Sequence, residues 1–248
     1  DTATGSPDAC TTCHAGKEPA WAASRIAEWY GPGRRREPVF GQALATDRKG
    51  TPGASAALIR LAADPMAPGI ARATAVAGLE RHLDQQAFVT IQEGLGDPDP
   101  MVRLAAVGTL STLDPQLRAQ VALPLLQDPV RAVRLEAARV LAPVQSVGLP
   151  PEQRSALEAA YAEYEAAQKT LLDRPEGLLT LGNFYRDRGR LAEAEEAYGT
   201  ALRLHPGFVP AYANLADLLR QLGRDGDGER ILEQGLAVAP ASAELTHA

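Results

Sequence analysis

The stretch that decides the fold runs from Pro100 to Leu110 and reads Pro-Met-Val-Arg-Leu-Ala-Ala-Val-Gly-Thr-Leu. Its pattern is an arginine followed by a small residue three positions later and a leucine seven positions later. The same pattern occurs around Arg72 and Arg134, each 31 residues from Arg103. These offsets place the three side chains along one side of a helix, where the small residue lets a neighbouring helix approach closely. The sequence therefore predicts helical hairpins stacked at a fixed period.

An Asp-Pro pair stands before each of these helices: Asp64-Pro65, Asp97-Pro98 and Asp128-Pro129. Asp can cap the free amides of a helix start, and Pro suits its first turn. With Arg103 and Arg134 each six residues after their aspartate, residues 39–144 resemble HEAT-like repeats. The resemblance implies a ladder of Asp and Arg between adjacent repeats, although Arg72, eight residues after Asp64, departs from the spacing and leaves its partner open. An anion-binding stripe is the alternative role of the arginines, and the ladder is the role the pattern favours.

Beyond a boundary at residues 143–151, which is rich in Pro and Gly, the period changes to 34 residues. The positions that follow the new spacing are Leu178, Leu181, Gly182, Tyr185, Ala194, Tyr198, Ala201 and Pro206. They resemble the tetratricopeptide (TPR) family, in which Gly182 and Ala194 would be the small residues where paired helices cross. A second copy has Gly228 and Gly235 in place of the usual alanines. Since each glycine costs ~1 kcal/mol in a helix interior, we expect this second hairpin to be softer.

Partial copies flank these two TPR hairpins. Ala160, Tyr164 and Ala167 match a second TPR helix, so a long helix over residues 151–172 is expected to double as part of a repeat. A third repeat would open near Ala243 and stop after six residues, which we interpret as the truncated end of a longer natural protein. The predicted fold is an all-α solenoid. Its three predicted parts are a haem attachment segment (1–37), HEAT-like repeats (38–148) and TPR repeats (149–248).

Composition agrees with packed helices and argues against nucleic acid. Hydrophobic residues make up 45% of the chain and aromatic residues only 5%, with few β-branched runs. The net charge is −6, so no overall basic field would hold a phosphate backbone. No apolar run approaches the ~20 residues that cross a bilayer, and we expect no transmembrane segment.

Both cysteines lie in one motif, Cys10-Thr11-Thr12-Cys13-His14, the signature of c-type haem attachment. Two thiols on one helical turn can form thioethers to the two haem vinyl groups, and the adjacent His14 can then bind the iron as proximal ligand. A zinc site would need about four ligands, and no second Cys/His pair follows at finger-like spacing. A thioredoxin-like pair would need a βαβ context, which a helical chain lacks. The motif predicts one covalent haem c.

An aromatic helix follows the motif. Trp21, Ile26 and Trp29 can share one apolar side, which suits packing against a haem or anchoring the helix to the first HEAT-like hairpin. On Cys10, Cys13, His14, Trp21, Trp29 and Tyr30, residues 6–30 resemble the last haem-binding stretch of periplasmic multihaem cytochromes that continue into HEAT and TPR repeats. The resemblance implies a periplasmic or extracellular protein of bacterial type and further upstream motifs, whereas only nine residues precede Cys10.

The distal iron ligand is harder to place. We predict Met66, in the turn before Arg72, as the internal candidate, and we expect Met101 to be a core residue. His82 and His205 are interpreted as ordinary polar positions, and another chain could also donate the ligand. The run Arg34-Arg35-Arg36 could meet haem propionates or an acidic partner, although a solvated charge run is the commoner explanation.

First TPR helices line a concave groove in that family, so partner-binding positions can be named. They are Asn183, Arg186, Asp187, Asn214, Asp217 and Arg220. This mixed polar set could hold an extended peptide, or it could simply be solvated surface. The leading hypothesis is an exported cytochrome subunit that carries electrons through one haem and docks to other electron-transfer proteins through its repeats. The alternative is a non-catalytic scaffold in which haem is absent or peripheral, and no constellation predicts an enzyme.

Overall fold

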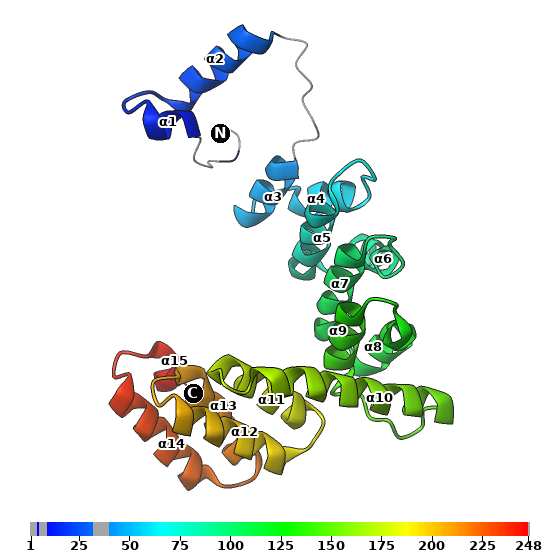
Figure 1. Cartoon of the computed structure of the whole chain (residues 1–248), viewed down its shortest axis with the longest axis vertical. Coiled ribbons are helices and arrows are strands. Elements are labelled where there is room, and N and C mark those ends of the chain that lie inside the picture. Colours follow the sequence, from blue (N-terminus) through cyan, green and yellow to red (C-terminus); the bar gives the residue numbers. More distant parts are fainter. Residues whose placement is uncertain (1–3, 5–8, 32–39, 248) are drawn as a thin grey trace. The chain divides into compact units, whose positions relative to one another are not determined.

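The computed structural model describes residue 4, residues 9–31 and residues 40–247. Over this part of the chain there are fifteen α-helices and no strands, which confirms the predicted all-α solenoid class (Figure 1). Contacts divide the chain into two compact units, residues 1–112 and residues 113–248. The second unit thus takes in the last HEAT-like hairpin, whereas the three-part division predicted from repeat type groups that hairpin with the HEAT-like repeats.

The helices of the first unit are short and follow one another at close intervals. They are α1 (Ala9–Cys13), α2 (Pro19–Tyr30), α3 (Phe40–Arg48), α4 (Ala54–Ala62), α5 (Gly69–Gly78), α6 (Gln85–Gly94) and α7 (Pro100–Thr109), with 3₁₀ turns η1 (Leu79–His82) and η2 (Leu110–Thr112).

The second unit contains longer helices. They are α8 (Pro115–Ala122), α9 (Arg131–Leu141), α10 (Pro151–Gln168), α11 (Pro175–Asp187), α12 (Leu191–Leu204), α13 (Val209–Gln221), α14 (Asp225–Val238) and α15 (Ala243–His247), with 3₁₀ turns η3 (Leu123–Gln127) and η4 (Lys169–Leu171).

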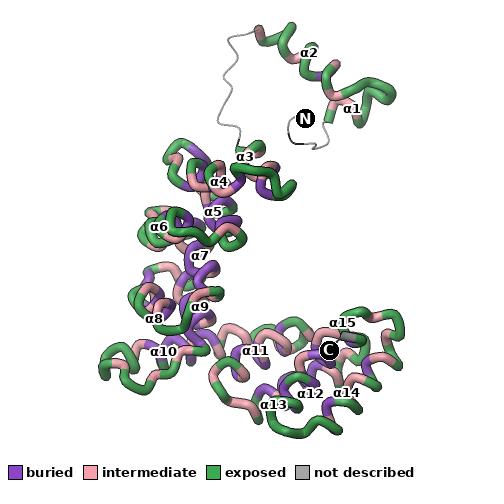
Figure 2. The backbone as a smooth tube through the Cα atoms, turned by 180° about the vertical axis from the view of Figure 1, so that it is seen from behind, coloured by how far each residue is buried: buried purple, intermediate pink, exposed green. Residues whose placement is uncertain are grey.

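The repeated alanine and leucine positions form the core of the HEAT-like part. Figure 2 shows buried residues concentrated along α5, α7 and α9, the helices that carry the 31-residue pattern. The fully buried members of the pattern are Ala75, Leu79, Ala106, Leu110, Ala137 and Leu141. Burying each leucine side chain contributes about 2 kcal/mol. The predicted face is therefore the packed face.

The Asp-Pro aspartates do not cap the helices that follow them, contrary to expectation. The side chain of each aspartate instead accepts a hydrogen bond from the backbone amide two residues later, which closes a tight turn. The donor is Met66 for Asp64, Asp99 for Asp97 and Val130 for Asp128, at 2.8–2.9 Å. The true cap of α7 is Asp99, whose Oδ1 accepts from the amide of Met101 at 2.9 Å. Asp84 and Asp114 cap α6 and α8 in the same manner. The reason is that Pro98 fits the turn ahead of α7, while Pro100 occupies its first position.

The predicted ladder forms within the first unit, and it includes Arg72. The Arg72 guanidinium pairs with the Asp97 carboxylate of the next repeat, with Nη2 to Oδ1 at 3.1 Å. Both side chains are only 14% exposed. The spacing within one repeat did not identify a partner for Arg72. The structure shows that this partner lies in the next repeat, 25 residues further along the chain.

The six-residue spacing has a local cause. Arg103 donates to the carbonyl oxygen of Asp97 at 2.8 Å, and Arg134 donates to that of Asp128 at 2.9 Å. An arginine in the first turn of a helix thus reaches back to the loop before it. Arg134 also pairs with Glu163 of α10 at 2.7 Å, and this hydrogen bond holds the pKa of Glu163 below its usual range.

The TPR-type hairpins pack as the 34-residue pattern predicts. Gly182 faces the ring of the buried Tyr198 so closely that a Cβ at Gly182 would overlap the ring edge. Ala194 is fully buried on the partner helix α12. The small residues therefore lie where α11 and α12 cross.

Gly235 lies at a tight contact of the second hairpin, whose expected softness stays a prediction. A Cβ there would lie 2.9 Å from Cγ of Tyr212 and 2.8 Å from Cδ1 of Leu245. Leu245 belongs to α15 and is buried against Tyr212 and Ala213. The expected opening of a third repeat near Ala243 is therefore present and packed.

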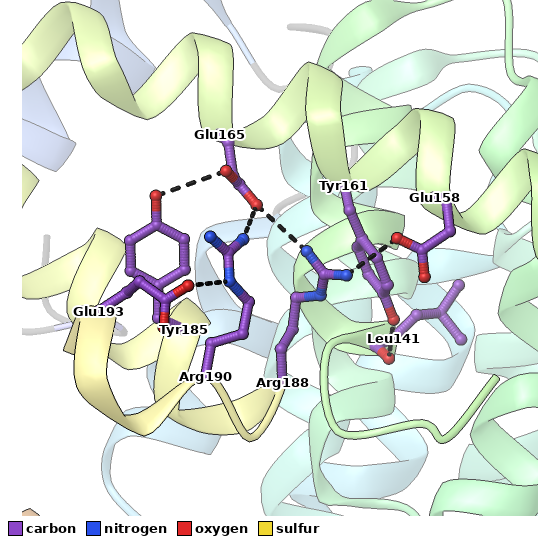
Figure 3. A network of polar contacts seen from close by, with 8 residues as sticks. All are labelled: Leu141, Glu158, Tyr161, Glu165, Tyr185, Arg188, Arg190 and Glu193. Atoms are coloured by element: carbon purple, nitrogen blue, oxygen red, sulfur yellow. Dashed lines mark hydrogen bonds and ion pairs between the residues drawn. The ribbon is translucent and has the colours of Figure 1, made fainter. Parts of the chain in front are cut away.

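The helix α10 joins the last HEAT-like helix to the TPR-type hairpins through the network drawn in Figure 3. The Tyr161 hydroxyl donates to the carbonyl oxygen of Leu141, the last residue of α9, at 2.8 Å. Burial of this ring raises the pKa of Tyr161 well above its usual value. The guanidinium of Arg188 lies over the same ring, 4.0 Å from its centroid.

The same face of α10 is also held by arginines from the turn between α11 and α12. Arg188 pairs with Glu158 at 3.0 Å and with Glu165 at 3.1 Å. Arg190 also pairs with Glu165, and its guanidinium lies 4.4 Å from the ring centroid of Tyr185 (Figure 3). The prediction that the junction helix serves as part of a repeat is consistent with this packing.

Candidate functional site

The Cys-x-x-Cys-His motif occupies one short helical turn. Cys10 and Cys13 lie in α1, and the amide of His14 donates to the carbonyl oxygen of Cys10 at 2.8 Å, which carries the helical bonding to the motif's end. Neither thiol is in a disulfide; Cys10 is half-buried and Cys13 exposed. The His14 side chain is exposed as well. Two accessible thiols and an accessible imidazole are therefore presented together from five consecutive residues.

Trp21 lies beside this turn. Its ring centroid is 4.9 Å from that of His14, with the planes inclined at 57°. The helix α2 that carries it begins with Pro19 in its first turn, and the Lys17 ammonium lies 5.9 Å from the Trp21 ring centroid. The contact links the candidate iron ligand to the first aromatic residue of α2.

The rest of the predicted aromatic face is open. Ile26 is half-buried, and Trp29 is 68% exposed. The donor set suits a covalent haem, since it offers two thiols for thioethers and one imidazole for iron. Trp21 beside His14, and the exposed Trp29 further along α2, offer aromatic surface that suits a flat apolar group as well. The residues present thus fit the haem c predicted from the motif, with Cys10, Cys13 and His14 as attachment residues and Trp21 and Trp29 as candidate packing residues.

The candidate distal ligands have varied surroundings. Met66 is 81% exposed in the turn before α5, so its thioether is accessible, and its role as distal ligand stays a prediction. Met101 is 44% exposed, and the expectation that it is a core residue is wrong. It stands in the first turn of α7, where no preceding helical turn covers it. His205 is half-buried in the turn after α12.

His82 belongs to a polar cluster that the sequence did not predict. Its Nε2 lies 2.8 Å from Oδ1 of Asp47, whose carboxylate is buried and also pairs with Arg81. Asp47 comes from α3, 35 residues before His82, so no local spacing indicates the pair. Within residues 9–31 and 40–247, no group of three or more His, Cys, Asp and Glu side chains could hold a metal ion.

The predicted concave positions come together in the second unit. The side-chain oxygen of Asn183 accepts from the Tyr198 hydroxyl at 2.7 Å and from the Asn214 amide at 2.8 Å. Asn183 and Asn214 therefore bridge α11 and α13, consecutive first helices of the two TPR-type hairpins. Burial raises the pKa of Tyr198 to about 12, so its hydroxyl remains a donor at neutral pH.

Paired charges lie on the same two helices. Arg186 pairs with Asp187 at 2.9 Å on α11, and Arg220 pairs with Asp217 at 3.3 Å on α13. All four side chains are between 34% and 59% exposed, so these pairs are available to a partner. Each of the two helices thus carries an Asn followed by two residues of opposite charge.

A further pair of opposite charges lies on α9, and sequence reasoning missed it. Arg139 pairs with Glu136 at 2.6 Å, and the charge of Asp187 acts on Arg139. The hydrogen bond that Arg139 donates to Glu136 is the main reason that the pKa of Arg139 is raised. Because α9 belongs to the HEAT-like pattern, a prediction confined to TPR positions could not include it. The signal was available, since Glu136 and Arg139 lie three residues apart on one helix face.

Two further expectations concern the chain outside this face. The run Arg34–Arg36 lies outside the described residues. Among the helices that the structure describes, none is both long enough and apolar enough to cross a membrane.

Comparison with known protein families identifies both repeat types. Residues 55–142 match the family model of HEAT repeats, and residues 185–247 match that of the tetratricopeptide repeat. No curated protein and no solved structure gives a significant match to the chain. Repeats of these two kinds build protein-interaction scaffolds rather than catalytic centres. The chain therefore carries HEAT and tetratricopeptide repeats on one all-α solenoid, with protein partners implied.

Proposed function

We propose that this protein is an exported c-type cytochrome subunit that carries electrons through one covalent haem and docks to redox partners through its repeats. The observation that carries the proposal is the α1 turn, where Cys10, Cys13 and His14 are all accessible and His14 contacts Trp21. The docking role is supported by Asn183, Asn214 and the paired charges on α11 and α13.

The residues of this chain have distinct tasks in the proposal. Each thiol adds across a vinyl group, forming an S–C bond while the thiol proton goes to the other vinyl carbon. His14 supplies the proximal imidazole nitrogen, and Trp21 limits the rotation of that ring through the 4.9 Å contact. The haem, when bound, supplies reversible one-electron chemistry at its iron. Trp29 offers exposed apolar surface that would exclude water from one side of the group.

The test is production of the chain in a bacterial host that exports it and attaches haem c. We expect intact mass to show one added haem and the pyridine haemochrome spectrum to show thioether-linked haem. Replacing both Cys10 and Cys13 with Ala should abolish covalent haem, whereas the matched change His205→Ala should leave it unchanged. Protein that folds and is exported yet carries no haem mass would overturn the proposal.

A scaffold without functional haem is the second candidate, and the match to two families of interaction repeats favours it. His14→Ala separates the two candidates when complex assembly and electron transfer are followed independently. Assembly without electron transfer supports the electron carrier. Assembly with electron transfer intact supports the scaffold.

A further inference from the structure

A groove of about 1120 Å³ opens between α8, the turn η3 and the start of α10, within the second unit. The loop after α9 closes one side of it through Val144 and Leu149. None of the positions named for docking in the TPR-type repeats lines this groove. Its volume slightly exceeds the roughly 300–1,000 Å³ that is usual for small-molecule sites.

The floor of the groove is apolar. Ala119 and Leu126 are buried there, and Leu123 and Val144 are half-buried beside them. Burying an aliphatic side chain of a ligand on this floor would contribute favourably, since apolar surface leaves water on both partners.

Five glutamines surround the floor, and all five are exposed. They are Gln116, Gln120, Gln127, Gln145 and Gln153. Each side-chain amide offers one acceptor and two donors, the same groups as a peptide backbone. None of these amides is hydrogen-bonded to another side chain or carbonyl within the described part of the chain. Side-chain amides that can still form hydrogen bonds, placed around an apolar floor, suit the backbone of an extended peptide.

The charge of the groove is of one sign. Asp114 and Glu152 line it, and the described lining residues include no Lys, Arg or His. Asp114 uses Oδ1 to cap α8, accepting from the Gln116 amide at 2.9 Å, while among the described residues no ion pair engages Glu152. Two carboxylates without a lining cation attract a cationic side chain and repel an acidic or nucleic acid ligand.

We propose that this groove is a second docking site, which binds an extended peptide segment of a partner protein carrying aliphatic and basic residues. An aliphatic side chain rests on Ala119 and Leu126, the peptide backbone exchanges hydrogen bonds with the glutamine amides, and a Lys or Arg meets Asp114 or Glu152. The site is independent of the haem and of the docking positions on α11 and α13.

Phage-displayed peptides of 12 residues, selected on the full chain, provide the probe. We expect enriched sequences to combine aliphatic residues with Lys or Arg. The dominant sequence is then synthesised with a fluorophore, and its affinity is measured by anisotropy. Gln120→Trp, which fills the groove from an exposed position on α8, should weaken binding at least tenfold. The matched change Gln221→Trp, at the exposed end of α13, should leave the affinity unchanged.

Charge is tested by a second matched pair. Glu152 and Glu176 each follow a Pro in the first turn of a helix, and only Glu152 lines the groove. Glu152→Gln should weaken binding about threefold and reduce its salt dependence, whereas Glu176→Gln should change neither. Circular dichroism and the melting temperature check that all variants fold.

The outcomes are decisive. Enrichment of acidic peptides, absence of any enriched peptide, or full binding to Gln120→Trp overturns the proposal. Because haem-free protein should bind the peptide equally well, failure of the haem proposal leaves this one standing, and the reverse also holds.

Discussion

A single carboxylate, that of Asp97, connects three parts of the HEAT-like repeats. Its side chain accepts from Arg72 of the preceding repeat and from the amide of Asp99, while its own carbonyl accepts from Arg103. Burial is the largest single influence and would raise the pKa of Asp97. The hydrogen bonds from Arg72 and from the Asp99 amide, together with the charges of Arg72 and Arg103, outweigh it and hold the pKa below its usual range. Asp97 therefore remains charged down to acidic pH.

We predict that Asp97→Asn lowers the free energy of unfolding of the HEAT-like part by about 2 kcal/mol at neutral pH, because it leaves the mostly buried Arg72 without the carboxylate it pairs with. The matched control is Asp64→Asn, which keeps the equivalent turn to Met66 and lacks the arginine hydrogen bond. It should cost less than about 0.5 kcal/mol. Urea unfolding followed by circular dichroism measures both.

The pH dependence follows from the sign of the shift. A carboxylate whose pKa is lower in the folded state stabilises the fold fully above its unfolded pKa of about 3.9. That contribution is lost as pH falls through the lower folded pKa. The stability difference between wild type and Asp97→Asn should therefore be constant near pH 7 and shrink below about pH 4. A difference that is already gone at pH 6 would contradict the assignment.

At the scale of the helix pair, Gly235 decides between two opposing effects. Helix propensity alone says that Ala should stabilise α14 by ~1 kcal/mol. The packing at Gly235 predicts that Ala should destabilise α14, since a Cβ there would overlap Tyr212 and Leu245. Overpacking of this kind costs about 1–3 kcal/mol, so packing outweighs propensity.

We predict that Gly235→Ala lowers the thermal stability of the TPR-type part. Gly199→Ala is the matched control, because Gly199 also lies inside a helix and its nearest neighbour is the flexible end of Arg203 at 3.4 Å. That change should stabilise by about 0.5–1 kcal/mol. Scanning calorimetry distinguishes the two signs, and equal stabilisation by both would show that α14 yields at this contact.

The same comparison shows what a sequence can predict for an element. The 31- and 34-residue periods predicted the packed faces because a helix face depends only on spacing along one segment. The partner of Arg72 was beyond that method, since Asp97 lies in the next repeat. The expected softness of the second hairpin rested on the number of glycines in α14, because the sequence does not show which side chains they face. The burial of Met101 was predicted wrongly because the sequence did not show where α7 begins.

The candidate sites divide in the same way. Cys10, Cys13 and His14 were predictable because their chemistry requires consecutive residues. The pair of Asn183 and Asn214 followed from the TPR pattern, and the structure brings them to 2.8 Å. The cluster of Asp47 and His82 and the glutamine groove depend on which helices meet, so no spacing along the chain predicts them.

At the scale of the whole molecule, stability in a repeat protein depends on neighbouring interfaces rather than on one shared core. Contacts here divide the chain into residues 1–112 and residues 113–248. We predict that Asp97→Asn raises hydrogen exchange in α5 and α7 and leaves the amide protection of α11–α14 unchanged. Mass spectrometry of exchanged peptides measures both regions, and a uniform increase would show that the chain unfolds as one cooperative unit.

The network around α10 has a consequence for engineering. One face of this helix supplies a hydroxyl, from Tyr161, to the end of a HEAT-type helix, and also a carboxylate, from Glu165, to two arginines of a TPR-type turn. A single helix face thus contacts both repeat types. Transplanted together with Arg188 and Arg190, it is a natural adaptor for fusing designed arrays of the two classes into one continuous chain.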